Sequence, residues 1–265
     1  MNRSTLIRGG ASIALGLSVA AVAGLIGGGT FAGSGKRDDY RILVAAMNGD
    51  LAQVRSLLNS GADPNSRPGP QDRGLDALML ASWGGHCDVL RVLVNAGANV
   101  NNRSEMRSTA LMLAADSGHS ACVRLLLNGG ADAAPRNEDA QTALHFAARN
   151  GHSLVVRLLA SRGNFANERD SRNLTPLMLS IVSGNQTMFD ALLQADPNLE
   201  VRDSNGQTAL MLAAKRGEPV MTRRLLENGA SVRARDNRQR TALSKARARN
   251  EQEIVDLLLA AGAVR

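Results

Sequence analysis

Histidine and cysteine are the side chains in this sequence best suited to metal binding, proton transfer or nucleophilic attack. The chain has four histidines and two cysteines among 265 residues. His86, His119 and His152 each follow a glycine and lie 33 residues apart, and His145 stands at another place in the same period. A catalytic or metal site needs several such groups to converge on one point. A regular spacing distributes them along the chain, so we interpret all four as structural residues.

Motifs that carry chemistry are also missing from the sequence. It has no glycine-rich phosphate loop, no nucleophile elbow and no metal-ligand motif. We therefore expect a protein that is not an enzyme and that uses neither a cofactor nor a metal ion. Composition is that of a folded protein, with 44% apolar and 21% charged residues, but only 2% are aromatic. A thin core of Leu, Val and Ala fits a linear stack of repeats better than a thick globular core.

The elements that position these residues recur with the same period of 33. One short motif starts each copy: Thr109-Ala-Leu-Met, Thr142-Ala-Leu-His, Thr175-Pro-Leu-Met, Thr208-Ala-Leu-Met and Thr241-Ala-Leu-Ser. Asp76-Ala-Leu-Met lies one period earlier, and Tyr40 begins a degenerate first copy. In each copy Thr or Asp is suited to cap a short helix, and Gly-His ends it in three copies. A second helix with Val and Leu at helical spacing follows.

This pattern resembles the ankyrin repeat, whose Thr-Pro-Leu-His tetrapeptide is represented by Thr142-Ala-Leu-His and Thr175-Pro-Leu-Met. The resemblance implies an all-α solenoid of about seven helix-turn-helix repeats with β-hairpin fingers. The ankyrin domain would cover residues 36–265, with repeats near 38–70, 74–105, 107–138, 140–171, 173–204, 206–237 and 239–265. We expect the turn at Asp196-Pro197 to be the most distorted, and Lys245 and Arg247 to form a polar C-terminal cap.

The two cysteines occupy different positions of successive copies. Cys87 lies 11 residues after its cap residue, whereas Cys122 lies 13 residues after its own. On a helix, an offset of two places side chains on nearly opposite faces. We therefore predict that Cys87 and Cys122 do not form a disulfide, that Cys122 replaces a core valine, and that Cys87 is more exposed.

The N-terminus has the pattern of a bacterial-type export signal or signal anchor, residues 1–35. Arg3 and Arg8 precede an uncharged stretch, Gly9–Gly35, which is most apolar at Ala11–Ile26. We expect an N-terminal hydrophobic helix there, contacting the membrane through residues 9–30 if it is not cleaved. Small-residue cleavage sites would end at Ala23 or Ala32. The charge balance predicts repeats outside the cytoplasm, either periplasmic or anchored to the inner membrane.

Ankyrin repeats generally bind proteins through their finger tips and the concave face formed by the first helices. The seventh and eighth residues after each cap vary within this chain, and Trp83 is its only tryptophan. We predict a monomeric scaffold that binds a protein, and the cations favour an acidic one. Its contact residues would be Met47, Trp83, Asp116 and Arg149, with Lys215, Arg216, Arg238 and Arg240 steering the partner.

Positive charge is concentrated in the last quarter of the chain. The net charge is +7, and residues 201–265 hold 13 Lys and Arg against 7 Asp and Glu, so +6 of it lies there. Binding of nucleic acid or another polyanion is therefore the alternative function. It is less favoured because these cations are not interleaved with aromatic residues.

Overall fold

The computed structural model describes residues 34–67, 74–160, 162 and 166–263. The export segment expected at 1–35, with its hydrophobic helix, lies outside the described residues except for its last two positions. No helix among the described residues is long and apolar enough to cross a membrane.

The described helices belong to two compact units, Met1–Glu138 and Asp139–Arg265. The first unit contains three helix pairs: α3 (Ser34–Asn48) and α4 (Leu51–Asn59), α5 (Ala77–Gly84) and α6 (Cys87–Asn95), α7 (Ala110–Asp116) and α8 (Ser120–Asn128). The second contains four: α9 (Ala143–Asn150) and α10 (Ser153–Ala160), α11 (Pro176–Ser183) and α12 (Gln186–Leu193), α13 (Ala209–Arg216) and α14 (Pro219–Glu227), α15 (Ala242–Arg247) and α16 (Gln252–Ala260). The predicted architecture of about seven helix pairs is thereby confirmed.

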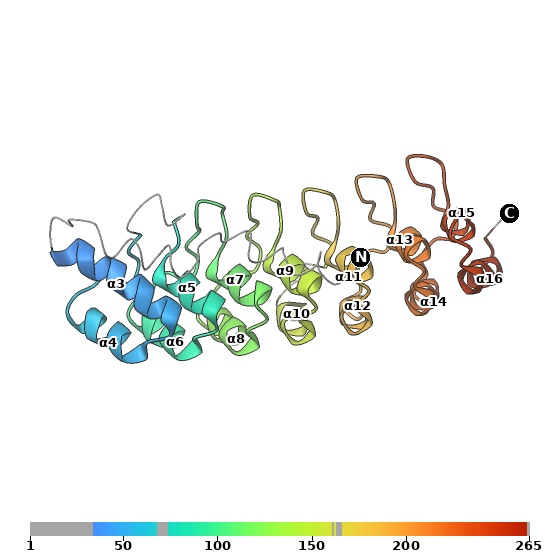
Figure 1. Ribbon diagram of the computed structural model, residues 1–265. Helices are drawn as coiled ribbons and strands as arrows, with labels where there is room; N and C mark the ends of the chain where they lie inside the picture. The colour runs from blue at the N-terminus through green and yellow to red at the C-terminus, as the bar shows by residue number, and fades with distance from the viewer. Residues whose placement is uncertain (1–33, 68–73, 161, 163–165, 264–265) are drawn as a thin grey trace, which may run out of the picture. The chain divides into compact units, whose positions relative to one another are not determined.

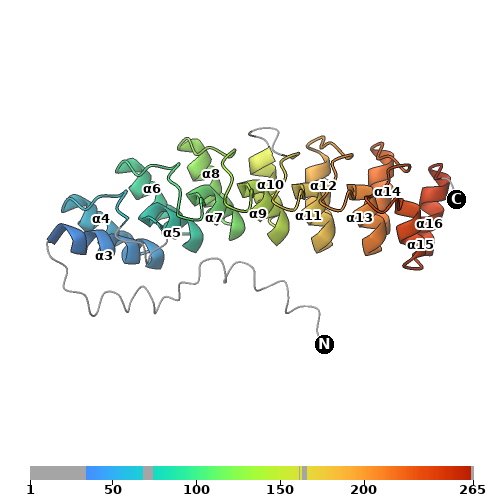
Figure 2. The ribbon, with the colours of Figure 1, turned by 90° about the horizontal axis from the view of Figure 1, so that it is seen from above.

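Within each unit the helices lie in two rows. In the first unit α3, α5 and α7 pack side by side, with α4, α6 and α8 beneath them in Figure 1. In the second unit α9, α11, α13 and α15 form one row and α10, α12, α14 and α16 the other, as Figure 2 shows from above. Within a unit, the first helices of successive pairs therefore pack on one another, and each also packs on the second helix of its own pair.

Side-chain caps fix where the first helix of each pair begins from α5 onward. The carboxylate of Asp76 accepts a hydrogen bond from the amide of Met79 at 2.9 Å, and Thr109 Oγ1 accepts one from Met112 at 3.3 Å. Burial raises the pKa of Asp76, although hydrogen bonds from Met79 and Asn102 and the charge of Arg67 oppose that rise. Alanine residues that follow, such as Ala114 and Ala115, are fully buried and let neighbouring helices approach closely.

The fingers between pairs are hydrogen-bonded turns, and the described residues contain no β-strand. At the tip of one finger the amide of Asp203 donates to Gln207 O at 2.9 Å and the amide of Gly206 donates to Asp203 O at 2.8 Å. The predicted β-hairpin is thus reduced to a single pair of backbone bonds at this tip, and the same pair recurs at Ser104, Asp170 and Asp236. Successive fingers are also linked, for example from the amide of Ser204 to Arg172 O at 3.1 Å.

Two of the expectations concern unusual positions. Asp196 adopts a left-handed conformation with φ 49°, whereas Gly97 and Gly229 have φ 90° and 84° in the equivalent turns. Pro197 also cannot donate the amide hydrogen bond that Ala98 and Ala230 donate in those turns. The turn at Asp196 therefore departs from these two, in line with the expectation. Contrary to expectation, Lys245 is not part of an exposed polar cap, since only 5% of it is exposed.

Candidate protein-binding surface

The histidines serve as links within the stack. In the first unit His86 Nε2 lies 3.0 Å from Met47 O, and His119 Nε2 lies 3.1 Å from Trp83 O, so each imidazole reaches the first helix of the preceding pair. His145 is fully buried, and its Nδ1 lies 2.9 Å from Thr142 Oγ1 in a capping box. These contacts confirm the structural interpretation for His86, His119 and His145.

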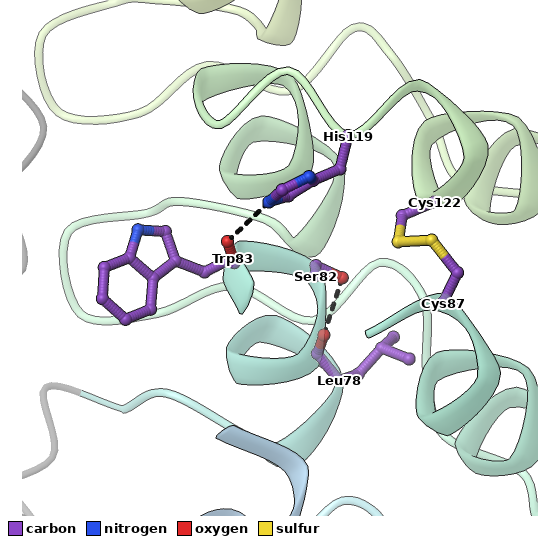
Figure 3. The surroundings of a disulfide bond; sticks show 6 residues. All are labelled: Leu78, Ser82, Trp83, Cys87, His119 and Cys122. Carbon is purple, nitrogen blue, oxygen red and sulfur yellow. Dashed lines mark hydrogen bonds between the residues drawn. A yellow bond between two sulfur atoms is a disulfide. The ribbon is translucent and has the colours of Figure 1, made fainter. Parts of the chain in front are cut away.

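Three of the predicted contact residues lie in the first unit, and Trp83 is the one whose side chain is partly exposed. It lies near the C-terminal end of α5 and is partly exposed. Its backbone carbonyl accepts from His119, which fixes the end of the helix while the indole ring projects from it (Figure 3). A large aromatic ring on a held backbone loses little entropy on binding.

Met47 and Asp116 occupy the same position in their copies but are buried, at 9% and 8% exposure. Asp116 is also engaged in an interaction within the fold. Their burial speaks against direct contact with a partner. In the first unit the candidate surface is therefore reduced to Trp83 and the backbone that presents it.

The second unit presents cations at the ends of its first helices. Lys215 and Arg216 close α13, and both are exposed. Arg247 and Arg249, at the end of α15 and just after it, are exposed as well. Arg149 is partly covered because its guanidinium lies over the ring of Phe146, 5.0 Å from the centroid. None of Lys215, Arg216, Arg247 and Arg249 forms an ion pair with a described carboxylate.

The two finger arginines predicted to steer a partner differ from each other. Arg240 is bonded to Asp236, with Nε 3.0 Å from Oδ2, so much of its charge is neutralised locally. Arg238 donates only its backbone amide to Asp236, and its exposed side chain has no ionic partner among the described residues. Arg238 therefore remains the better candidate of the two.

A disulfide joins Cys87 and Cys122, which contradicts the prediction that they do not pair. Their Cα atoms are 5.0 Å apart, and the bond connects α6 to α8 (Figure 3). The prediction was wrong because it assumed that cysteines on opposite helix faces cannot meet. When equivalent helices of successive repeats pack, the face of one helix that points toward the C-terminal repeats contacts the face of the next helix that points toward the N-terminal repeats. Cysteines on opposite faces are therefore what a bond between successive copies requires. The expectation that Cys122 is buried in the core and Cys87 is more exposed is confirmed.

The described residues offer no group of three His, Cys, Asp or Glu side chains that could hold a metal ion. The described side chains instead leave one projecting tryptophan in the first unit and exposed cations without ion pairs in the second.

Comparison with known proteins identifies the family. A family described as ankyrin repeats in three copies matches the chain over three ranges, residues 42–137, 129–203 and 188–264. The chain belongs to the ankyrin repeat family. Proteins of this family are typically non-enzymatic scaffolds for protein–protein interaction.

Individual relatives agree with this assignment. The crystal structure of the ankyrin repeat domain of Bcl-3, a member of the IkappaB protein family, is similar with a TM-score of 0.73 and 29% identity. The match covers 83% of this chain and 97% of that one. M-phase phosphoprotein 8 from human and from mouse is 39% identical over 66 residues, which is 25% of this chain. The match spans only 8% of those proteins.

Proposed function

We propose that this chain is an exported or membrane-anchored scaffold that binds a protein partner through Trp83 and through the cations at the first-helix ends of its second unit. The observation that carries the proposal is the partial exposure of Trp83 on a backbone fixed by His119 at 3.1 Å. Tryptophan is enriched among residues that dominate binding energy, especially where its backbone is already ordered.

The charge of the second unit favours an acidic partner. Lys215, Arg216 and Arg238 are exposed, and their charges are not neutralised by described carboxylates. Such cations accelerate association with an acidic surface and add to specificity, and both effects weaken with salt.

Replacing Trp83 with Ala tests the proposal. We expect the full chain to capture its partner from an extract of the native host, and the Trp83→Ala variant to bind that partner at least about tenfold more weakly. Circular dichroism should be unchanged, because the indole ring is not part of the buried core. A matched control is Leu154→Ala, which removes an exposed apolar side chain from α10. Equal binding by wild type and Trp83→Ala, with both folded, would reject this surface.

Binding to a polyanion is the second candidate, favoured by Lys215 and Arg216 at the end of α13 and by Arg247 and Arg249 at the end of α15 and just after it. Retention of single-stranded DNA at low salt, with a steep loss as salt rises, would support it. The Lys215→Ala/Arg216→Ala variant should then bind DNA more weakly, while Trp83→Ala should not differ from wild type. No binding at low salt would remove this candidate.

Export is part of the proposal because the sequence and the chemistry of the cysteines favour the same compartment. Residues 1–35 have the charge and hydropathy pattern of an export signal. Disulfides form and persist mainly outside the cytoplasm, so the bond between Cys87 and Cys122 supports a location in the periplasm or on the outer side of the inner membrane.

A further inference from the structure

Both cysteines stand where this chain departs from its own repeat pattern. The position of Cys87 is Ser120 in the next copy and Ser153 in the one after. The position of Cys122 is Val89 in the preceding copy and Val155 in the following one. These two exceptions, in adjacent copies, are the two residues that are bonded to each other.

We propose that the Cys87–Cys122 disulfide is a redox-controlled clamp that holds the second and third repeats together and thereby fixes the Trp83 surface. Its effect on binding rests on the function proposed above, whereas its effect on the repeats does not.

Two cross-links connect the same pair of repeats. The disulfide joins α6 to α8, and the His119–Trp83 hydrogen bond joins the start of α8 to the end of α5. Cys87 follows Trp83 by four residues, and Cys122 follows His119 by three. Figure 3 shows the disulfide on one side of α5 and the indole ring of Trp83 projecting away from it. Losing the disulfide leaves the hydrogen bond, the packing of α5 on α7 and the packing of α6 on α8 to hold this interface.

The two sulfurs differ in accessibility, which determines how the clamp opens and closes. Cys122 is fully buried, whereas Cys87 is partly exposed at the first residue of α6. Both cysteines lie in the first turn of a helix, but only Cys87 is accessible from solvent, so Cys87 is the sulfur that reacts with external thiols and disulfides. Closure removes two protons and two electrons from the two thiols. The acceptor is the disulfide of a thiol–disulfide oxidoreductase, which becomes a dithiol after passing through a mixed disulfide with Cys87. A dithiol reductant reverses these steps.

Hydrogen exchange on the full chain, before and after treatment with dithiothreitol, tests the clamp. We expect exchange in 87–95 and 120–128 to rise about tenfold or more on reduction, because cross-linking restricts opening of the segment between the bonded residues. Exchange in 139–265 should stay unchanged. Trp83 is the only tryptophan, so its emission should shift on reduction and report the loosened surface.

The matched variant is Cys87→Ser/Cys122→Val, which restores residues found at these positions in neighbouring copies and is expected to fold. It should exchange like the reduced wild type and should not respond to dithiothreitol. In single variants, Cys87 in Cys122→Val should form a mixed disulfide with oxidised glutathione much faster than Cys122 in Cys87→Ser.

Unchanged exchange in 87–95 and 120–128 after verified reduction would overturn the clamp, as would an equal response of the double variant to reductant. Neither result depends on a partner. A clamp that opens as expected, together with unaltered partner binding by Trp83→Ala, would instead reject the proposed binding surface and leave the clamp standing.

Discussion

At the scale of single residues, Lys245 shows how the last repeat differs from those before it. Its position is occupied by Leu212 one copy earlier, yet Lys245 is buried. Its Nζ lies 2.7 Å from Asp236 Oδ2 and 3.0 Å from Gln207 Oε1. A buried ammonium is tolerated only with such partners, so this lysine joins two successive fingers to the first helix of the last repeat.

The ionised form of the Asp236 carboxylate is stabilised by the same contact with Lys245. Burial by itself would raise the pKa of Asp236. Hydrogen bonds from Lys245, from the amide and guanidinium of Arg240 and from the amide of Arg238 outweigh burial and hold the pKa well below its usual range. A pKa that is lower in the folded than in the unfolded chain stabilises the fold above the unfolded value, about 4, and this contribution is lost as pH falls.

Lys245→Leu should therefore destabilise the second unit by about 1–3 kcal/mol at neutral pH. It should also raise the pKa of Asp236, so that the acid-induced loss of stability begins at a higher pH than in wild type. Urea unfolding between pH 3 and 7 measures both effects. The variant Lys245→Leu/Arg240→Gln reproduces the Gln207 and Leu212 environment of Asp203 and should recover part of the stability. Identical pH profiles for wild type and Lys245→Leu would contradict this account.

At the scale of elements, the finger turns impose a left-handed backbone on one residue per repeat. The equivalent residues are Gly74 (φ 65°), Arg107 (φ 58°), Ala140 (φ 57°), Asn173 (φ 58°), Gly206 (φ 75°) and Gln239 (φ 58°). Only the two glycines adopt this conformation without steric cost, and Asn tolerates it better than Ala does. The turn is held by backbone bonds to its neighbours, so most repeats retain it despite an unfavourable residue.

Ala140→Gly should consequently stabilise the second unit, by about 0.5–1 kcal/mol, because it removes the strain of a Cβ at positive φ. The control is Ala147→Gly in α9, where glycine should destabilise by about 1 kcal/mol or more. Urea unfolding monitored by circular dichroism distinguishes the two. A destabilising Ala140→Gly would show that the turn gains more from the methyl group than its conformation costs.

At the scale of the whole molecule, charge, cysteines and N-terminus belong to different parts of the chain. The disulfide lies in the first unit, most of the excess positive charge lies in the second, and the export pattern lies at the start of the chain. Each therefore makes a separate contribution to the proposed function. The export pattern determines the compartment, the disulfide holds the structure around Trp83, and the positive charge attracts an acidic partner.

We expect the chain in its native host to be recovered outside the cytoplasm with the Cys87–Cys122 bond formed. Its intact mass should be lower than that of the reduced chain by the mass of two hydrogen atoms, and the mass also shows whether cleavage has followed Ala23 or Ala32. Replacing Arg3 and Arg8 with Glu removes the basic start of the export pattern and should retain the protein in the cytoplasm. Recovery of the unaltered chain in the cytoplasm with both thiols reduced would contradict the proposed location.

The sequence by itself determined the repeat, its period and the positions of the helices, because caps, small residues and left-handed glycines are local signals that recur in successive copies. It also accounted for His86, His119 and His145, whose roles follow from their place in the period. Only the tertiary structure decided the burial of Met47, Asp116 and Lys245, since burial depends on which surfaces neighbouring copies cover.

The disulfide is the clearest case of that difference. The positions that Cys87 and Cys122 occupy in the repeat lie on opposite faces of its second helix, and from this alone the sequence predicts no bond. Between repeats, the forward face of α6 meets the rear face of α8, which brings the two Cα atoms to 5.0 Å. Periodicity describes each copy separately, whereas pairing depends on the translation from one copy to the next, which only packing fixes.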